Sequence, residues 1–330
     1  MRFLPTDEQA DFARTLRSLL GSAQVPAAVR AWADGEHGPG LALRSRLAGT
    51  GLFALAAPES YEGAGLLPLE LALGFVELGR AGVPGPVVES AAVSVLLSEL
   101  GDEALAKRFL PGLVAGGAWA TLTLPGGSPY ALDADAAEYC FTVSAAAELR
   151  LAAPASGAAL RSTDPARRLS RPAADGGELL AAGPAVARAA GAAGRWARLL
   201  TAAQCLGTGE ALLERTVGYV KQRTQFGAPI GSFQAVKHRL ADTLLALEFA
   251  RPLVWAAGLS LAPGDVAAAK LRCGEAAYRA ALTALQLHGA VGYTEELDLS
   301  LWLRKARPLR DAWGTPSECR AEVLRSVTPG

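Results

Sequence analysis

Residues 223–234 read RTQFGAPIGSFQ, and this segment separates two long stretches that have helical periodicity. The first stretch covers Ala197–Gln222, and the second covers Ser232–Leu259, in which leucines recur on one helical face. A third stretch, Val266–His288, ends at Gly289, a residue type that commonly stops a helix. The C-terminal half is therefore predicted to be a bundle of long helices.

Two irregularities are expected within this half. Pro252 predicts a kink or a break in the second long helix, because proline has no backbone N–H to donate. Residues Arg307–Val327 are predicted to begin as a loop and to end as a last helix.

The N-terminal part of the chain is also helical in pattern. Thr6-Asp7-Glu8-Gln9 has the form of a capping box, and apolar residues follow it at helical spacing. About five or six helices are expected before Gly116, with Pro and Gly between them. After this point, short apolar runs alternate with turn residues, which predicts short strands at Ala118–Leu124, Tyr139–Val143 and Leu149–Ala153.

The order of these segments predicts a mainly α protein in three parts. An N-terminal helical domain is expected over 1–116, a small middle β-domain over 117–183, and a C-terminal helical-bundle domain over 184–330. The hydrophobic fraction of 51% is enough for a sizeable core, which excludes a wholly disordered chain.

The composition also argues against several classes of partner and cofactor. The 32 basic and 32 acidic residues balance, so nothing in the overall charge recommends a nucleic acid or a membrane surface as partner. No apolar stretch is long enough to span a bilayer, and residues 2–8 do not resemble a signal peptide. The four cysteines and three histidines are scattered, so no metal site is expected, and a cytoplasmic protein with reduced thiols is predicted.

The segment 223–234 has the residues of a site for an anion and a ring. Arg223 can form two hydrogen bonds to a pyrophosphate, Phe226 can lie along a flat heterocycle, and Gln234 can donate from the start of a helix. Taken alone, the segment is more typical of an arginine at a helix C-terminus, where the helix dipole favours a cation.

Three further features have ordinary structural explanations when each is taken alone. Gln286–Tyr293 contains two glycines and is typical of a helix stop, with His288 as a structural or capping residue. The cations at 304, 305, 307 and 310, and those at 167, 168 and 171, are expected to form solvated surfaces.

Considered together, the order and spacing of these motifs resemble the acyl-CoA dehydrogenase family. The matching segments are Arg223–Gln234, Lys237–Asp242, Gln286–Tyr293, Arg304–Thr315 and, in the N-terminal half, Gly51–Tyr61 and Glu77–Arg80. The resemblance implies FAD as cofactor, an acyl-CoA substrate and an electron-transfer flavoprotein or similar acceptor. It also implies that the two glycine-containing turns contact the adenosine and pyrophosphate of a neighbouring subunit's FAD; the residues concerned are Arg223, Gln225, Phe226, Phe233, Gln234, Gln286 and Gly289.

The sequence departs from the family at the catalytic base and in the middle segment. The two positions at which the family carries its glutamate are Trp313 and Ala197 here, and neither side chain can take a proton from carbon. The stretch that seats the flavin ring in the family is largely missing, and Leu124 replaces its acidic residue.

This pattern resembles the base-less subunit of actinobacterial heterotetramers that act on CoA thioesters of steroid side chains. The resemblance implies a homologous partner subunit that carries the catalytic glutamate, in an α2β2 complex. Two alternatives are a self-sufficient homomeric dehydrogenase that uses Asp311 or Glu318 as base, and a non-enzymatic acyl-CoA-binding or scaffold protein.

Overall fold

The computed structural model describes residues 4–153, 159–173 and 176–328. Its N-terminal part consists of six α-helices with short 3-10 turns and a two-stranded hairpin between them. The capping box at Thr6 is confirmed, since its hydroxyl accepts from the Gln9 amide and the Gln9 side chain accepts from the Thr6 amide. These helices are α1 (Asp7–Ser22), α2 (Val25–Ala33), α3 (Gly38–Ala48), α4 (Pro68–Ala81), α5 (Val87–Leu100) and α6 (Glu103–Val114), and the hairpin pairs β1 (Ala56–Ala57) with β2 (Gly65–Leu66).

The middle segment forms two small sheets. In the four-stranded sheet the order is β3-β5-β6-β9, with β3 and β5 parallel and the other pairs antiparallel. In the three-stranded sheet the order is β4-β8-β7, all antiparallel. The strands are β3 (Ala120–Thr123), β4 (Ala131–Leu132), β5 (Tyr139–Val143), β6 (Glu148–Leu151), β7 (Leu160–Arg161), β8 (Arg168–Ser170) and β9 (Glu178–Ala182).

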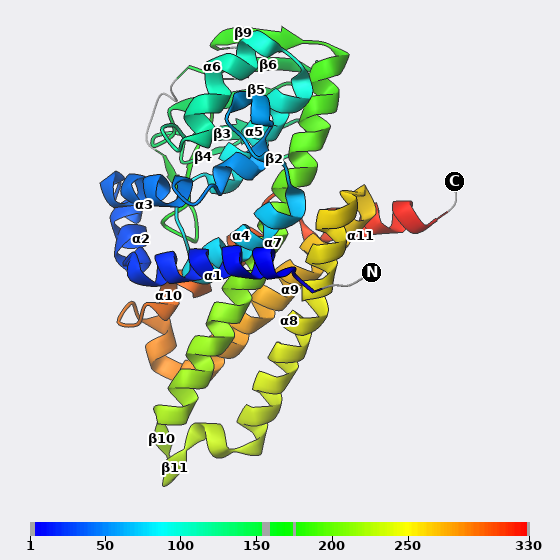
Figure 1. Ribbon diagram of the computed structural model, residues 1–330. Coiled ribbons are helices and arrows are strands. Elements are labelled where there is room, and N and C mark those ends of the chain that lie inside the picture. The colour runs from blue at the N-terminus through cyan, green and yellow to red at the C-terminus, as the bar shows by residue number, and fades with distance from the viewer. Residues whose placement is uncertain (1–3, 154–158, 174–175, 329–330) are drawn as a thin grey trace.

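The C-terminal half is a helical bundle built around one very long helix. This helix, α7 (Pro184–Gln222), has 39 residues and runs from the sheet end of the molecule to the hairpin of β10 (Thr224–Gln225) and β11 (Ala228–Pro229) (Figure 1). Four more helices follow: α8 (Gln234–Ser260), α9 (Pro263–His288), α10 (Leu299–Asp311) and α11 (Pro316–Val327).

Two expectations in this half are corrected by the structure. Of the kink or break expected at Pro252, the break does not occur, because helix α8 continues through this residue. Residues from Arg307 to Asp311 are not a loop, because they form the last turn of α10. Burial of Trp302, Ala306 and Leu309 holds α10 against the bundle and offsets the hydrogen bond that Pro308 cannot make.

Close packing joins the N-terminal helices to the bundle. Helices α4 and α7 touch backbone to backbone, because Gly79 and Gly207 have no side chain; a Cβ on Gly207 would collide with the carbonyl oxygen of Val76. Beside this contact Arg80 pairs with the buried carboxylate of Glu210, which also forms an ion pair with Arg251 of α8 at 2.7 Å. The two halves of the chain therefore share one core.

No helix in the described ranges combines the length and the apolar character that a bilayer crossing requires. The same residues hold no group of three or more His, Cys, Asp or Glu side chains arranged to bind a metal ion.

Candidate functional site

The segment predicted to bind an anion and a ring lies at the free end of α7. Arg223 ends the helix, and its amide donates to the Tyr219 carbonyl at 2.9 Å. The Arg223 carbonyl accepts from the Ile230 amide at 2.8 Å, which closes the β10–β11 hairpin. The hairpin fixes the backbone while the side chains of Arg223 and Gln225 remain exposed.

Two phenylalanines form an exposed aromatic pair at this turn, Phe226 in the hairpin and Phe233 directly before α8. Phe226 is 93% exposed and adopts a left-handed backbone with φ of 53°, which is uncommon for a large side chain. Its ring lies 6.3 Å from that of Phe233, nearly edge to face. Gln234 follows as the first residue of α8 and is exposed. An exposed aromatic pair in a strained turn is typical of a surface that another molecule covers.

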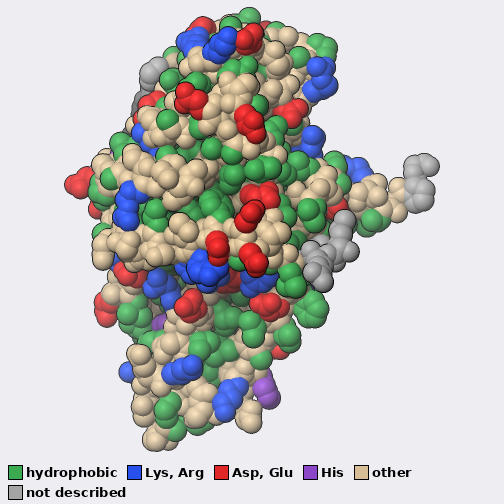
Figure 2. All heavy atoms as spheres, viewed as in Figure 1, with side chains coloured by type: hydrophobic (Ala, Val, Ile, Leu, Met, Phe, Trp, Pro, Cys, Tyr) green, Lys and Arg blue, Asp and Glu red, His purple; other side chains and the backbone are tan. Residues whose placement is uncertain are grey.

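The charge of this end favours an anionic ligand. Residues 215–241 contain five Lys or Arg and no Asp or Glu. In Figure 2 the lowest part of the molecule, around the hairpin, displays Lys, Arg and His side chains without an acidic one on the face shown. Within the described ranges, no carboxylate lies within ion-pair distance of Arg223, so its guanidinium has no internal partner to compete with a ligand.

The second predicted turn ends α9 at the same end of the bundle. Gln286 and Gly289 are exposed, and Gly289 has a positive φ of 62°. Between them His288 is buried and stacks on Tyr219 of α7, with ring centroids 4.1 Å apart. Because Tyr219 lies one turn before Arg223, this stack brings the two predicted turns together.

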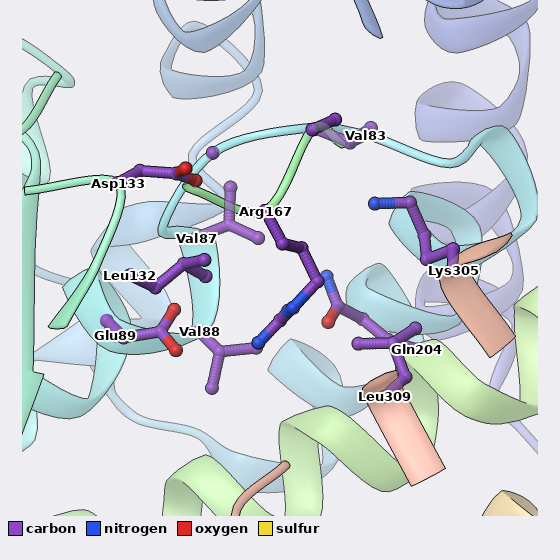
Figure 3. Close-up of a pocket in the computed structure, with 12 residues that line it drawn as sticks. Val83, Val87, Val88, Glu89, Leu132, Asp133, Arg167, Gln204, Lys305 and Leu309 are labelled. Atoms are coloured by element: carbon purple, nitrogen blue, oxygen red, sulfur yellow. The ribbon is translucent and has the colours of Figure 1, made fainter. Parts of the chain in front are cut away.

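A cavity of about 10 Å³ lies where the N-terminal helices, the middle strands and the bundle meet, and Arg167 reaches into it between Val88 and Gln204 (Figure 3). This volume has room for about one water molecule. The lining residues are Val83, Gly85, Val87, Val88, Glu89, Leu132, Asp133, Ala166, Arg167, Gln204, Lys305 and Leu309.

The cavity is surrounded by buried charges. Burial raises the pKa of Glu89, although nearby Arg167 and a hydrogen bond from Trp313 oppose the shift. Burial also raises the pKa of Asp133 to about 7. Lys305 is buried and pairs with the buried Asp164 at 3.0 Å. The expectation of solvated surfaces was therefore wrong for Lys305 and Arg167, which meet acidic groups from distant segments.

The loop that follows α10 is hydrogen-bonded to Glu89 of the cavity lining and to helices α7 and α9. Trp313 Nε1 donates to Glu89 Oε1 at 3.0 Å, and Arg198 Nε donates to the Trp313 carbonyl at 2.9 Å. Lys270 Nζ donates to the carbonyls of Arg310 and Gly314 at 2.7 and 3.0 Å. Trp313 has a left-handed backbone, with φ of 54°, so these contacts hold the loop in a strained form.

None of the positions considered for a base, Trp313 included, lines the cavity. Ala197 is fully buried in α7. Glu318 caps α11, and hydrogen bonds from the Thr315 amide and hydroxyl lower its pKa. Asp311 pairs with Arg310 at 3.0 Å. The sequence reasoning missed Glu89, whose signal was a single acidic residue inside the apolar run 83–97.

The cavity and the exposed turns are far apart in one chain. Gln204 lines the cavity and Arg223 ends the same helix nineteen residues later, which corresponds to about 28 Å at the rise of an α-helix. The turn offers a cation, amides and aromatic rings to a dinucleotide, so it fits the phosphate and adenosine portion of FAD. The cavity does not fit a three-ring flavin, because it has room for about one water molecule and Arg167 reaches into it.

Comparisons with known proteins agree with this architecture. Residues 6–117 match the model of the acyl-CoA dehydrogenase N-terminal domain, and residues 187–327 match that of the C-terminal domain. Acyl-CoA dehydrogenase IpdE2 of Mycobacterium tuberculosis is 34% identical, with 98% of this chain and 97% of that protein covered.

Two solved structures show the same fold. The Tcur3481-Tcur3483 steroid ACAD G363A variant superposes with a TM-score of 0.82 at 23% identity, covering 97% of each chain. PigA with FAD and proline superposes with a TM-score of 0.86 at 21% identity, covering 99% of each chain.

Proposed function

This chain belongs to the acyl-CoA dehydrogenase family, and on that premise we propose that it is one subunit of a heteromeric, FAD-dependent acyl-CoA dehydrogenase. The partner is a homologous subunit that carries the catalytic glutamate, in an α2β2 complex. The substrate class is the CoA thioester of a steroid side chain, following the structural relative named as a steroid ACAD. This chain completes the partner's FAD site and supplies no base of its own.

The proposed reaction removes two hydrogens from adjacent carbons of the acyl chain. The proton on the α-carbon is only weakly acidic, so a carboxylate must be held close to it, and the partner supplies that carboxylate. FAD, when bound, accepts the hydride from the β-carbon. The task of this chain is to bind and orient: Arg223 pairs with the pyrophosphate, the Phe226–Phe233 pair packs against the adenosine, and Gln234 and Gln286 donate hydrogen bonds.

The observation that carries the proposal is the separation of the two regions within one chain. The cavity at the domain junction has room for about one water molecule, whereas the exposed turn with Arg223 lies about 28 Å away. A dinucleotide held at this turn therefore needs a second chain to seat its flavin ring.

The surface of α8 supports a partner subunit. Leu244, Leu245 and Phe249 of this helix are exposed, Phe249 by 71%. They lie on the helix that begins at the exposed turn, so a subunit whose FAD contacts the turn is placed to cover them. The apolar side chains left on the surface of one subunit are typical of a protein–protein interface.

The self-sufficient alternative is less compatible with the geometry. Asp311 and Glu318 are engaged with Arg310 and Thr315 and do not line the cavity. Glu89 does line the cavity, but Arg167 and Trp313 occupy the space beside it, where a thioester and a flavin would have to fit. A non-enzymatic scaffold would leave the combination of Arg223, Phe226 and Gln286 unexplained.

The test is co-expression of this chain, carrying an affinity tag, with each homologous subunit from its source organism that has a glutamate at the base position. The chain alone is expected to purify colourless and inactive, and one partner is expected to bring about one FAD per pair of subunits. A stoichiometric flavin spectrum in the chain alone would overturn the proposal. So would the absence of flavin and of acyl-CoA oxidation with every such partner.

A further inference from the structure

We propose that Tyr219 and His288 are positioning residues that fix the spacing of the two FAD-contacting turns; this inference rests on the proposed function. Neither side chain belongs to the motif residues assigned to the cofactor. Tyr219 lies within α7, one turn before Arg223, and His288 lies between Gln286 and Gly289 at the end of α9. The pair therefore connects the two segments whose side chains must reach one ligand.

The contact between them is aromatic and well defined. The rings stack with centroids 4.1 Å apart and planes inclined by 23°. The Tyr219 hydroxyl also donates a long hydrogen bond, at 3.5 Å, to the His288 carbonyl. Because that carbonyl precedes Gly289, the contact acts on the backbone at the point where α9 ends.

His288 is itself held in one orientation. It is buried, and its Nδ1 lies 2.8 Å from the Ala284 carbonyl one turn earlier in α9. Gly292 packs against the His288 Cβ, where a larger residue would be crowded. The imidazole is therefore a fixed surface against which the Tyr219 ring rests.

The same stack controls the start of the other turn. The Tyr219 carbonyl accepts the Arg223 amide at 2.9 Å, and Val220 packs against Gly231 of the 3-10 turn Ile230–Ser232. A displaced Tyr219 would carry Arg223 and the hairpin with it. The loss of the ring is thus expected to misplace Arg223 relative to Gln286 without removing either side chain.

The experiment titrates FAD into the apo form of the co-purified complex and follows flavin fluorescence. Tyr219→Leu removes the ring and is expected to weaken FAD affinity by roughly 2- to 12-fold, the value of an aromatic pair. Tyr219→Phe keeps the ring and should restore wild-type affinity. Tyr278→Leu is the matched control, because Tyr278 is a partly buried tyrosine of the same bundle that contacts Arg310 instead.

A double-mutant cycle with Arg223→Ala separates positioning from general stability. If Tyr219 acts through Arg223, the double variant Tyr219→Leu/Arg223→Ala binds FAD no more weakly than Arg223→Ala alone. Additive losses, or unchanged affinity in Tyr219→Leu, would overturn the inference. If Tyr219→Leu unfolds, Tyr219→Met, which is closer to tyrosine in length, takes its place in the same cycle.

The two proposals fail in different ways. A wild-type complex that holds no FAD contradicts the proposed function and this inference together. A wild-type complex that holds FAD while Tyr219→Leu and Tyr278→Leu behave alike contradicts the positioning role only.

Discussion

Under the proposed function, replacing Arg223 by alanine should release FAD from the assembled complex. Arg223 is exposed, and no acidic group of the described chain lies within ion-pair distance, so its removal breaks no internal ion pair. The cost to folding is limited to the interaction of a cation with the end of α7, about 0.3–1 kcal/mol. A charge-assisted contact to pyrophosphate is worth about 1.5–3 kcal/mol, which corresponds to a loss of roughly 10- to 150-fold in FAD affinity.

The assay is a titration of apo complex with FAD, run beside a thermal melt of the same sample. Arg223→Lys should restore only part of the affinity, because the ammonium cannot form the two parallel hydrogen bonds of a guanidinium. Arg188→Ala is the control, since Arg188 is an exposed arginine at the opposite end of the same helix. Equal FAD affinity in wild type and Arg223→Ala would show that the motif is only a helix terminus.

Three further predictions follow from the rest of the structure. The double substitution Leu245→Glu/Phe249→Glu on α8 should prevent co-purification of the partner and leave the melting temperature of the lone chain nearly unchanged. The control Leu179→Glu, at an equally exposed leucine of β9, should still co-purify with the partner. A partner retained by the α8 variant would refute this interface. Asp133 is preferentially protonated in the folded chain because burial raises its pKa from 3.8 to about 7, so its contribution to stability falls as the pH rises from about 4 to 7. Asp133→Asn keeps an acceptor for the Arg168 amide. In urea unfolding, its free energy of unfolding should rise relative to that of the wild type by up to about 4 kcal/mol as the pH increases from 4 to 8. A difference between the two proteins that does not depend on pH would contradict this. Trp313→Glu places a second carboxylate beside the buried Glu89, so it should lower the melting temperature of the lone chain and yield no acyl-CoA oxidation. Turnover by this variant would mean that the chain contains a complete active site.

The helices could be predicted from the sequence because their apolar periodicity and capping residues are local signals. The capping box at Thr6 and the stop of α9 at Gly289 required only neighbouring residues. The helical pattern was predicted to return at about Pro184, but a continuous helix only from Ala197, thirteen residues after α7 begins; the first turns of α7 are rich in alanine and glycine and show little apolar contrast. Alanine can be buried without producing an amphipathic pattern.

The filled cavity was beyond sequence reasoning because its partners come from distant segments. Lys305 is one of several cations in a short stretch, and nothing near it in sequence indicates that Asp164 will neutralise it inside the protein. The sequence likewise predicts that Arg167 is a residue of a surface loop, but in the folded chain this loop lies near the N-terminus of α5, beside Glu89. Local patterns predict which residues are helical, whereas the partner of a buried charge is decided by topology.

The bonds that hold the loop after α10 have an evolutionary consequence. Trp313 donates to the buried Glu89 carboxylate, and Arg198 and Lys270 donate to partly buried carbonyls of the loop and of the last turn of α10. Removing any one of them takes away a hydrogen-bond partner, and for a fully buried group such as Glu89 the unpaired state costs about 1–3 kcal/mol. Opening this site by single substitutions would therefore pass through several destabilised variants, each of which loses a hydrogen bond before any space for a ligand is gained. Under the proposed function the partner subunit supplies the open site, so nothing favours the first of these steps in this chain.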